Sequence, residues 1–242
     1  MKRISLVIAM LSEAEPLVAL LGLKKHSLGA FYDQLQFQIY SGVYKNKIHL
    51  SLILPGLDPR YQMDSIGTEP ATVAAFIAIK ELSPNIIISA GTAGSFKAVG
   101  AKVGKVYLSD KQFYFHDHRI PIPGWKEYGE GHYPSLNVKK MADELSIEVA
   151  DVSSGSSLDF TDQDLNRIKE NNAKLKEMEA AGVAWIAFVT HTPMFAIKSV
   201  TNLIDENQDS ATEFTKNFAI AVESLTQTVV QTLDYLSVHD LF

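Results

Sequence analysis

The chain has 242 residues, of which 46% are hydrophobic and 21% are charged, and its formal net charge at pH 7 is −6. The acidic balance argues against nucleic acid as the main partner, and the complete lack of cysteine excludes disulfides, thiol nucleophiles and thiolate zinc sites. No apolar run has the length of a membrane-spanning helix, so we expect a cytoplasmic protein without a membrane partner.

Short apolar segments predict strands along the whole chain. The segment 85–90 is apolar throughout, which is typical of a strand that is covered on both faces. The predicted strands are residues 4–10, 48–54, 85–90, 103–108, 147–152 and 193–201.

Helical patterns separate these strands, over residues 71–82, 162–169, 178–190 and 212–236. Thr68 is a candidate N-cap of the first helix, with Pro70 in the first turn. The helix 178–190 is small and apolar on nearly every face, which indicates a buried helix. Glu179 begins that helix and is directed toward apolar surroundings, where an unpaired charge is costly, unless it simply turns to solvent. The alternation of strands and helices predicts one three-layer α/β domain over residues 1–242.

Several predicted strand ends carry residues suited to a ligand site, because ligands collect at the carboxyl ends of strands in open α/β sheets. Glu13 follows the first strand, and Thr92 lies in the small-residue segment 89–95 after the third. The segment 153–160 is a further small-residue turn, and Asn202 follows the last strand. Each piece alone is also compatible with an ordinary solvated turn; their order along the chain favours a site.

The order of these segments resembles the nucleoside phosphorylase/nucleosidase superfamily, and within it the plant-type 5′-methylthioadenosine nucleosidases. The resemblance covers nearly the whole chain. Its motifs are residues 8–17, 64–68, 90–94, 115–123, 157–159, 178–181 and 200–203. It implies a nucleoside phosphorylase/hydrolase-like α/β/α fold with a central mixed sheet, and hydrolysis of the N-glycosidic bond of 5′-methylthioadenosine, with S-adenosylhomocysteine as a second candidate substrate. No cofactor is implied.

The family's site residues transfer to matching positions of this sequence. By the resemblance, Glu13 is the general base that activates water, and Glu179 binds the ribose hydroxyls. Such carboxylates suit an oxocarbenium-like transition state. Met178 packs on the sugar, Thr92 and Lys198 lie near the water and ribose, Leu158 lies against the purine, and the backbone beside Asp159 reads the base edge. The expected substrate-binding residues are Met10, Thr92, Ala93, Gly94, Leu158, Asp159, Met178, Glu179 and Lys198.

Asn202 departs from the family pattern, because it occupies the position of the catalytic aspartic acid that protonates N7 of the purine. An amide can donate a hydrogen bond to N7 but cannot transfer a proton, and the loss of a general acid costs roughly 10²–10⁴ in rate. Three hypotheses follow: a slow or disarmed methylthioadenosine nucleosidase, a nucleosidase for 6-oxopurines, or a protein that binds adenine nucleosides without cleaving them. Asp205 is a poor substitute, since family members carry an aspartate there without that role.

Two further interpretations are less favoured. A phosphorylase would need an anion site, usually with arginine, and the Thr92 segment supplies none. His116 and His118 beside one aspartate are a poor metal ligand set, so we expect no metal. By the resemblance, the aromatic and proline-rich segment 113–125 is a dimer-contact loop, which implies a homodimer; ordinary core packing of these aromatic residues is the alternative.

Overall fold

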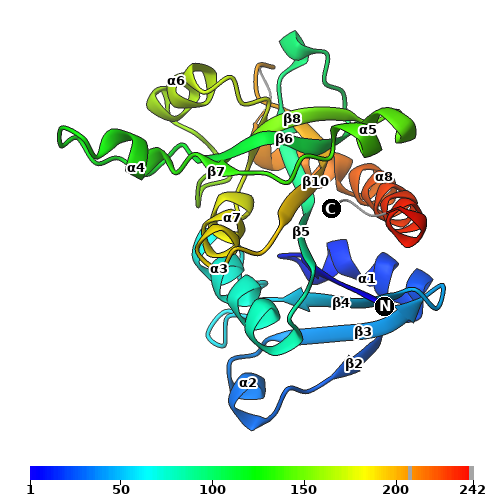
Figure 1. The fold of residues 1–242 in the computed structure, drawn as a ribbon. Helices are drawn as coiled ribbons and strands as arrows, with labels where there is room; N and C mark the ends of the chain where they lie inside the picture. The colour runs from blue at the N-terminus through cyan, green and yellow to red at the C-terminus, as the bar shows by residue number, and fades with distance from the viewer. Residues whose placement is uncertain (207–208, 240–242) are drawn as a thin grey trace.

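The computed structural model describes residues 1–206 and 209–239, and its described part contains one mixed sheet of ten strands (Figure 1). The order of the main path is β10-β6-β8-β9-β5-β1-β4-β3-β2, and β7 pairs with β6 at the side. The strands are β1 (Lys2–Val7), β2 (Lys24–His26), β3 (Gln38–Tyr44), β4 (Ile48–Leu54), β5 (Ile86–Ser95), β6 (Val106–Phe115), β7 (Tyr133–Pro134), β8 (Glu148–Ser154), β9 (Leu175–Glu177) and β10 (Met194–Leu203).

Half of this sheet closes on itself, which the sequence did not predict. Strand β10 pairs with β6 and, on its other edge, with β5. The short strand β9 joins β5 to β8, so β5, β10, β6, β8 and β9 form a closed ring. Parallel pairs such as β1–β4 and antiparallel pairs such as β3–β4 both occur, as expected for a mixed sheet.

Helices cover both faces of the sheet (Figure 1). Alternate residues of β1 face opposite layers: Val7 belongs to the core that includes alanines of α3 and α7, whereas Leu6 belongs to the core beneath α1, α5 and α8. None of the described helices is long and apolar enough to cross a membrane. The helices are α1 (Leu11–Leu21), α2 (Ala30–Gln34), α3 (Thr68–Ile77), α4 (Lys126–Glu130), α5 (Lys139–Leu145), α6 (Asp162–Glu170), α7 (Ala180–Val189) and α8 (Ser210–Val238), with a π-helical turn η1 (Ala78–Leu82) and a 3₁₀ turn η2 (Lys97–Val99).

The predicted α/β class and most elements are confirmed, but several boundaries were wrong. Strand β5 continues through the small residues 91–95, because Gly94 and Ser95 pair with both β10 and β9. Strand β10 likewise includes Asn202, which had been placed after its end. Helix α3 begins at Thr68 with Gly67 as its N-cap, so Thr68 is not the cap. In each case pairing or packing with distant segments outweighs the local composition.

Candidate active site

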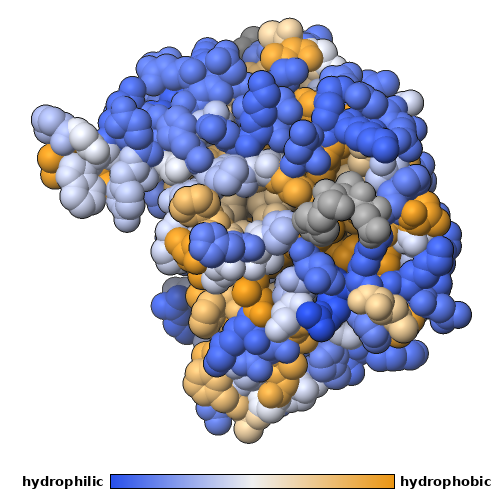
Figure 2. All heavy atoms as spheres, in the orientation of Figure 1, coloured by the Kyte–Doolittle hydropathy of each residue, from blue (hydrophilic) through white to orange (hydrophobic). Residues whose placement is uncertain are grey.

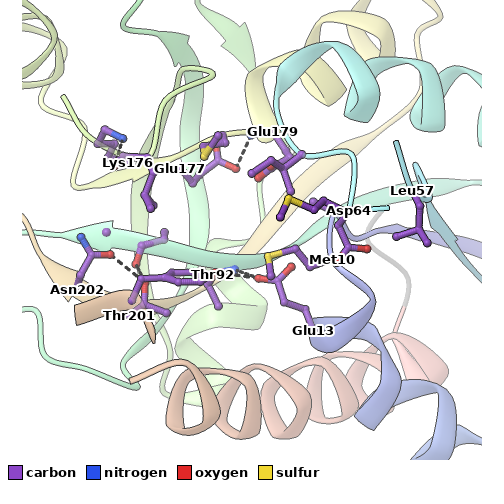
Figure 3. A pocket seen from close by; sticks show the side chains of 18 of the residues that line it. Met10, Glu13, Leu57, Asp64, Thr92, Lys176, Glu177, Glu179, Thr201 and Asn202 are labelled. Carbon is purple, nitrogen blue, oxygen red and sulfur yellow. Dashed lines mark hydrogen bonds between the residues drawn. The ribbon is translucent and has the colours of Figure 1, made fainter. Parts of the chain in front are cut away.

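A cavity of about 410 Å³ opens where the carboxyl ends of β5, β9 and β10 meet the starts of α1 and α7 (Figure 3). Most of the predicted site residues line it: Met10, Glu13, Thr92, Ala93, Gly94, Leu158, Met178, Glu179 and Asn202. Two of them do not. Asp159 is exposed outside the cavity, and Lys198 is buried beneath its lining. Asn202 and Lys176 lie at one end of the cavity, and Leu57 and Asp64 lie at the other (Figure 3).

Glu13, the predicted general base, lies in the first turn of α1 and is only 3% exposed. One carboxylate oxygen, Oε1, accepts hydrogen bonds from the Thr92 backbone N–H at 2.9 Å and from the Thr92 hydroxyl at 2.8 Å. Burial raises the pKa of Glu13 above its ordinary value, and the hydrogen bonds from Thr92 and the charge of Lys198 offset only part of this effect. A buried carboxylate that is oriented through one oxygen has the other available to a ligand.

Glu179, the predicted ribose-binding residue, is the N-cap of α7 rather than its first helical residue. Its Oε1 accepts a hydrogen bond from the Gly67 backbone N–H at 3.1 Å. Burial raises the pKa of Glu179 to about 7, and the negative charges of Glu177 and Glu13 add to the shift. Glu179 is partly exposed and lines the cavity, where Glu177, Glu13 and Lys198 are its charged neighbours.

Glu177 also lines the cavity, and the sequence analysis did not single it out. Its carboxylate pairs with Lys198 Nζ at 2.7 Å and accepts hydrogen bonds from the Ser154 hydroxyl and from the backbone N–H groups of Glu179 and Ala180. Burial opposes ionisation of Glu177, but the charge of Lys198 and these donors outweigh it and hold the pKa below its ordinary value. Its place two residues before Glu179 was the only available sequence signal.

The end of the cavity that holds Asn202 is built from three adjacent strands. Asn202 pairs with Gly94 across β10 and β5, at a register shift in β10, and its Oδ1 accepts a hydrogen bond from the Thr201 hydroxyl at 2.9 Å. A Cβ atom on Gly94 would lie 3.0 Å from Asn202 Nδ2 and 3.1 Å from Ile204 Cδ1, so a larger residue here would press on both side chains. Lys176 pairs with Gly94 from the opposite side, on β9. Lys176 was also missed by the sequence analysis.

Asp205 belongs to a different local structure. Its carboxylate accepts hydrogen bonds from the backbone N–H groups of Lys97 and Ala98, at 2.6 and 2.9 Å, at the start of η2. These bonds outweigh the effect of burial and lower the pKa of Asp205, so it stays ionised. Asp205 does not line the cavity.

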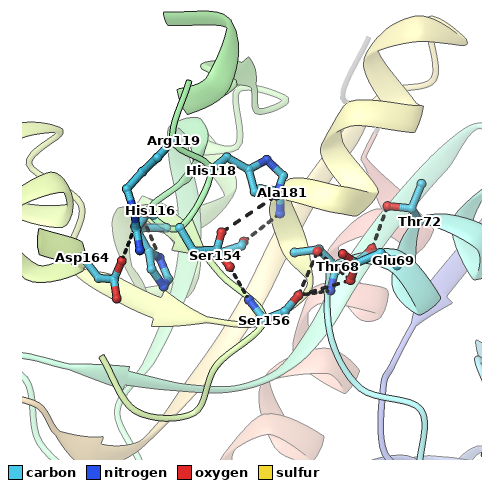
Figure 4. A network of polar contacts seen from close by, with 12 residues as sticks. Thr68, Glu69, Thr72, His116, His118, Arg119, Ser154, Ser156, Asp164 and Ala181 are labelled. Carbon is cyan, nitrogen blue, oxygen red and sulfur yellow. Dashed lines mark hydrogen bonds and ion pairs between the residues drawn. The ribbon is translucent and has the colours of Figure 1, made fainter. Parts of the chain in front are cut away.

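The segment that carries Leu158 is held by a polar network on the far side of the cavity lining (Figure 4). The Ser156 hydroxyl accepts a hydrogen bond from Thr68 N–H at 3.2 Å and donates to Glu69, while Ser156 N–H donates to Asp117 at 2.8 Å. These contacts fasten the segment both to the start of α3 and to the chain after β6.

His116 is buried beneath this segment, and burial lowers its pKa to about 4. A Cβ atom on Gly155 would lie 2.4 Å from His116 Nε2, so the tight approach requires glycine. Within residues 1–206 and 209–239, no group of three or more histidine, aspartate or glutamate side chains is arranged to hold a metal ion. His116 Nδ1 lies 3.2 Å from the Ser153 hydroxyl, and the His118 ring stacks on Phe115.

Comparisons with known proteins identify the family. A family model described as the phosphorylase superfamily matches residues 3–234. A 5′-methylthioadenosine nucleosidase of Arabidopsis thaliana is 37% identical over 235 residues, which are 97% of this chain and 87% of the relative. An Arabidopsis 5′-methylthioadenosine/S-adenosylhomocysteine nucleosidase is 34% identical over 231 residues, 96% of this chain and 90% of the relative. The apo structure of the Arabidopsis 5′-methylthioadenosine nucleosidase superposes with a TM-score of 0.96 at 36% identity, covering 100% of this chain and 98% of that one. The chain therefore belongs to the phosphorylase superfamily and, within it, to the family of plant-type 5′-methylthioadenosine/S-adenosylhomocysteine nucleosidases.

Proposed function

We propose that the protein hydrolyses the N-glycosidic bond of 5′-methylthioadenosine and releases adenine and 5-methylthioribose. The observation that carries this proposal is the convergence of Glu13, Glu179 and Asn202 on one cavity, together with relatives that are named for this substrate. The cavity volume of about 410 Å³ lies in the range of sites for small molecules.

Glu13 acts as the general base in this proposal. The nucleophile is a water molecule, and Glu13 Oε2 takes its proton while Thr92 holds Oε1 in place. The ribose ring gains positive charge as the bond to the base breaks, and the nearby carboxylates of Glu13 and Glu179 stabilise that charge. Glu179 also accepts hydrogen bonds from the ribose hydroxyls, which fixes the sugar between the two acids.

The far end of the cavity suits the 5′ substituent. Once the ribose lies at Glu179 and the base at Asn202, the 5′ carbon is directed toward the end that holds Leu57 and Asp64. Met63 and Ile66 are further apolar residues of the cavity lining. These apolar side chains fit a methylthio group, because its transfer from water to an apolar surface is favourable. Asp64 lies at the same end and Gln62 also lines the cavity, so the polar amino acid part of S-adenosylhomocysteine is a second candidate for this space, and the test below compares the two substrates.

The test is release of free base, measured by chromatography from 5′-methylthioadenosine, S-adenosylhomocysteine and inosine. Rapid release of adenine from 5′-methylthioadenosine is expected, and the Glu13→Gln variant, which keeps the shape of the side chain, serves as the matched control. Release of hypoxanthine alone would replace the proposal by a 6-oxopurine nucleosidase. Tight binding of 5′-methylthioadenosine without release, in both the unmodified chain and Asn202→Asp, would favour a binding protein.

We also propose that the protein is a homodimer. Apolar side chains of α3 and α7 are exposed side by side. Figure 2 shows hydrophobic surface over these helices, below the arm, which we define as residues 116–132 between β6 and β7 and which carries α4. The exposed residues are Val73, Phe76, Trp185, Phe188 and Val189 on the helices, and Ile122, Trp125 and Tyr128 on the arm. Exposed apolar patches of this kind mark interaction surfaces. Light scattering in solution is the test, and a monomeric mass at micromolar concentration would refute this part of the proposal.

A further inference from the structure

Lys176 is the one cationic residue that lines the cavity within the described part of the chain. It lies on β9 and is 5% exposed. Its ammonium group donates hydrogen bonds to the carbonyl oxygens of Ser157 and Leu158, at 2.7 and 3.1 Å. An ammonium group has three N–H donors, so one remains after these two bonds.

Lys176 and Asn202 flank the same glycine. Gly94 on β5 pairs with Asn202 of β10 on one side and with Lys176 of β9 on the other. Directly paired residues on neighbouring strands project to the same face of the sheet, so both side chains belong to the cavity face. Two strand spacings, about 10 Å, separate their backbones. Both residues line the same cavity, while the space directly over Gly94 is filled by the Asn202 amide and by Ile204.

The hydrolysis needs a proton at this end of the cavity. Asn202 cannot give one, and its amide oxygen already accepts the Thr201 hydroxyl. The Asp205 carboxylate lies outside the cavity lining and already accepts hydrogen bonds from the backbone N–H groups of Lys97 and Ala98. Resting on the proposed hydrolysis of 5′-methylthioadenosine, we propose that Lys176 is the catalytic residue that protonates the departing purine, with Asn202 as a hydrogen-bond donor that orients the base.

The proton balance of this step is complete. The C1′–N9 bond breaks with its electron pair remaining on the purine, and the Lys176 ammonium transfers a proton to purine N7 and becomes a neutral amine. The oxygen of water forms the new bond to C1′ and its proton passes to Glu13. Exchange with solvent then returns a proton to Lys176 and removes one from Glu13, so the net reaction consumes one nucleoside and one water.

The surroundings of Lys176 are compatible with an acid of moderate strength. Burial lowers the pKa of Lys176 below its ordinary value, and the negative charges around it offset only part of that effect. Those charges are Glu177 on β9, Asp159 after β8, Asp164 on α6 and Asp117 after β6, while His116 is the further titratable group nearby. A lysine in such a position transfers its proton more readily than one in water.

The test measures single-turnover release of adenine from 5′-methylthioadenosine by the unmodified chain and by four variants. These are Lys176→Ala, Lys176→Arg, Asn202→Asp and the double variant that combines Lys176→Ala with Asn202→Asp. Lys176→Ala is expected to slow release roughly 10²-fold or more. Lys176→Arg retains the charge and the donors but is expected to remain slow, because arginine does not give up its proton. Added primary alkylammonium ions are expected to restore release by Lys176→Ala, more strongly for the more acidic amines. In the Asn202→Asp background the effect of Lys176→Ala is expected to shrink, since the new carboxyl supplies the proton.

The control is Lys174→Ala, because Lys174 precedes β9 and does not line the cavity. Full activity of Lys176→Arg, or an equal loss from Lys176→Ala in both backgrounds without rescue by amines, would overturn the role of Lys176 and leave the substrate unaffected. Release of adenine by Asn202→Asp but not by the unmodified chain would also overturn the role of Lys176 and leave the substrate unaffected. Failure of both the unmodified chain and Asn202→Asp to release adenine would overturn the proposed function itself, and the role of Lys176 with it.

Discussion

Glu177 and Lys198 form an ion pair at 2.7 Å in which both side chains are almost completely buried, and Glu177 also lines the candidate active site. The pair connects the end of β9 to the middle of β10. The positive charge of Lys198 lowers the pKa of Glu13 and of Glu179, whereas the negative charge of Glu177 raises the pKa of Glu179. The pair as a whole therefore leaves the negative charge of the other two glutamates uncompensated. Lys198 itself does not form part of the cavity lining.

Removing one member of this pair is expected to destabilise the fold strongly. Lys198→Met leaves the Glu177 charge buried and unpaired, and such a change typically lowers the free energy of unfolding by about 3–5 kcal/mol. The double variant Glu177→Gln, Lys198→Met removes both charges and is expected to recover part of that loss. Urea denaturation at pH 7 measures both values, and equal stabilities of the single variant and the unmodified chain would contradict the importance of the pair.

Thr92 is expected to determine the pH at which kcat/KM for adenine release falls on the acid side. Its hydroxyl bond to Glu13 favours the ionised carboxylate, so Thr92→Val raises the pKa of Glu13 further. A general base must be ionised, and the acid limb of kcat/KM for adenine release should therefore move to higher pH. Thr92→Ser keeps the hydroxyl and is the matched control. An unchanged acid limb in Thr92→Val would mean that another group controls it.

Glu179 is expected to make stability depend on pH near neutrality. Its pKa is raised to about 7 in the folded protein, above its ordinary value of 4.5, so the folded state holds a proton that the unfolded chain has lost. The contribution of this group is complete below about pH 4.5 and is lost as the pH rises to about 7. Thermal unfolding between pH 5 and 8 should therefore show a steeper decline for the unmodified chain than for Glu179→Gln. Parallel curves would contradict the raised pKa.

The sequence predicted the parts of the site that depend on local pattern and family resemblance. Glu13 and Glu179 were assigned from motifs, and both line the cavity. Lys176 and Glu177 were missed because their roles arise from pairing between strands that are distant in sequence: β9 has three residues, too few for a periodic signal, and it exists because β5 and β8 accept it as a neighbour. Lys198 was placed near the water and ribose by the resemblance alone; its ion pair with Glu177 joins β10 to β9, which no local pattern predicts.

Gly182 lies where α7 packs closely against α3. A Cβ atom at this position would lie 2.5 Å from the Thr68 carbonyl oxygen and 2.6 Å from Thr72 Oγ1. Alanine is the better helix former by about 1 kcal/mol, but overpacking of this kind typically costs about 1–3 kcal/mol. Gly182→Ala is therefore expected to lower the free energy of unfolding, measured by chemical denaturation.

The matched control for Gly182→Ala is Gly129→Ala in α4, where the nearest atom to a new Cβ lies at an ordinary 3.5 Å. That variant should be neutral or slightly stabilising, because it gains helix propensity without a clash. Thr68 also donates its N–H to Ser156, so a shift of α3 in Gly182→Ala should reach the segment that carries Leu158 and weaken 5′-methylthioadenosine binding. Unchanged stability and binding in Gly182→Ala would show that α3 and α7 can separate without disturbing the cavity.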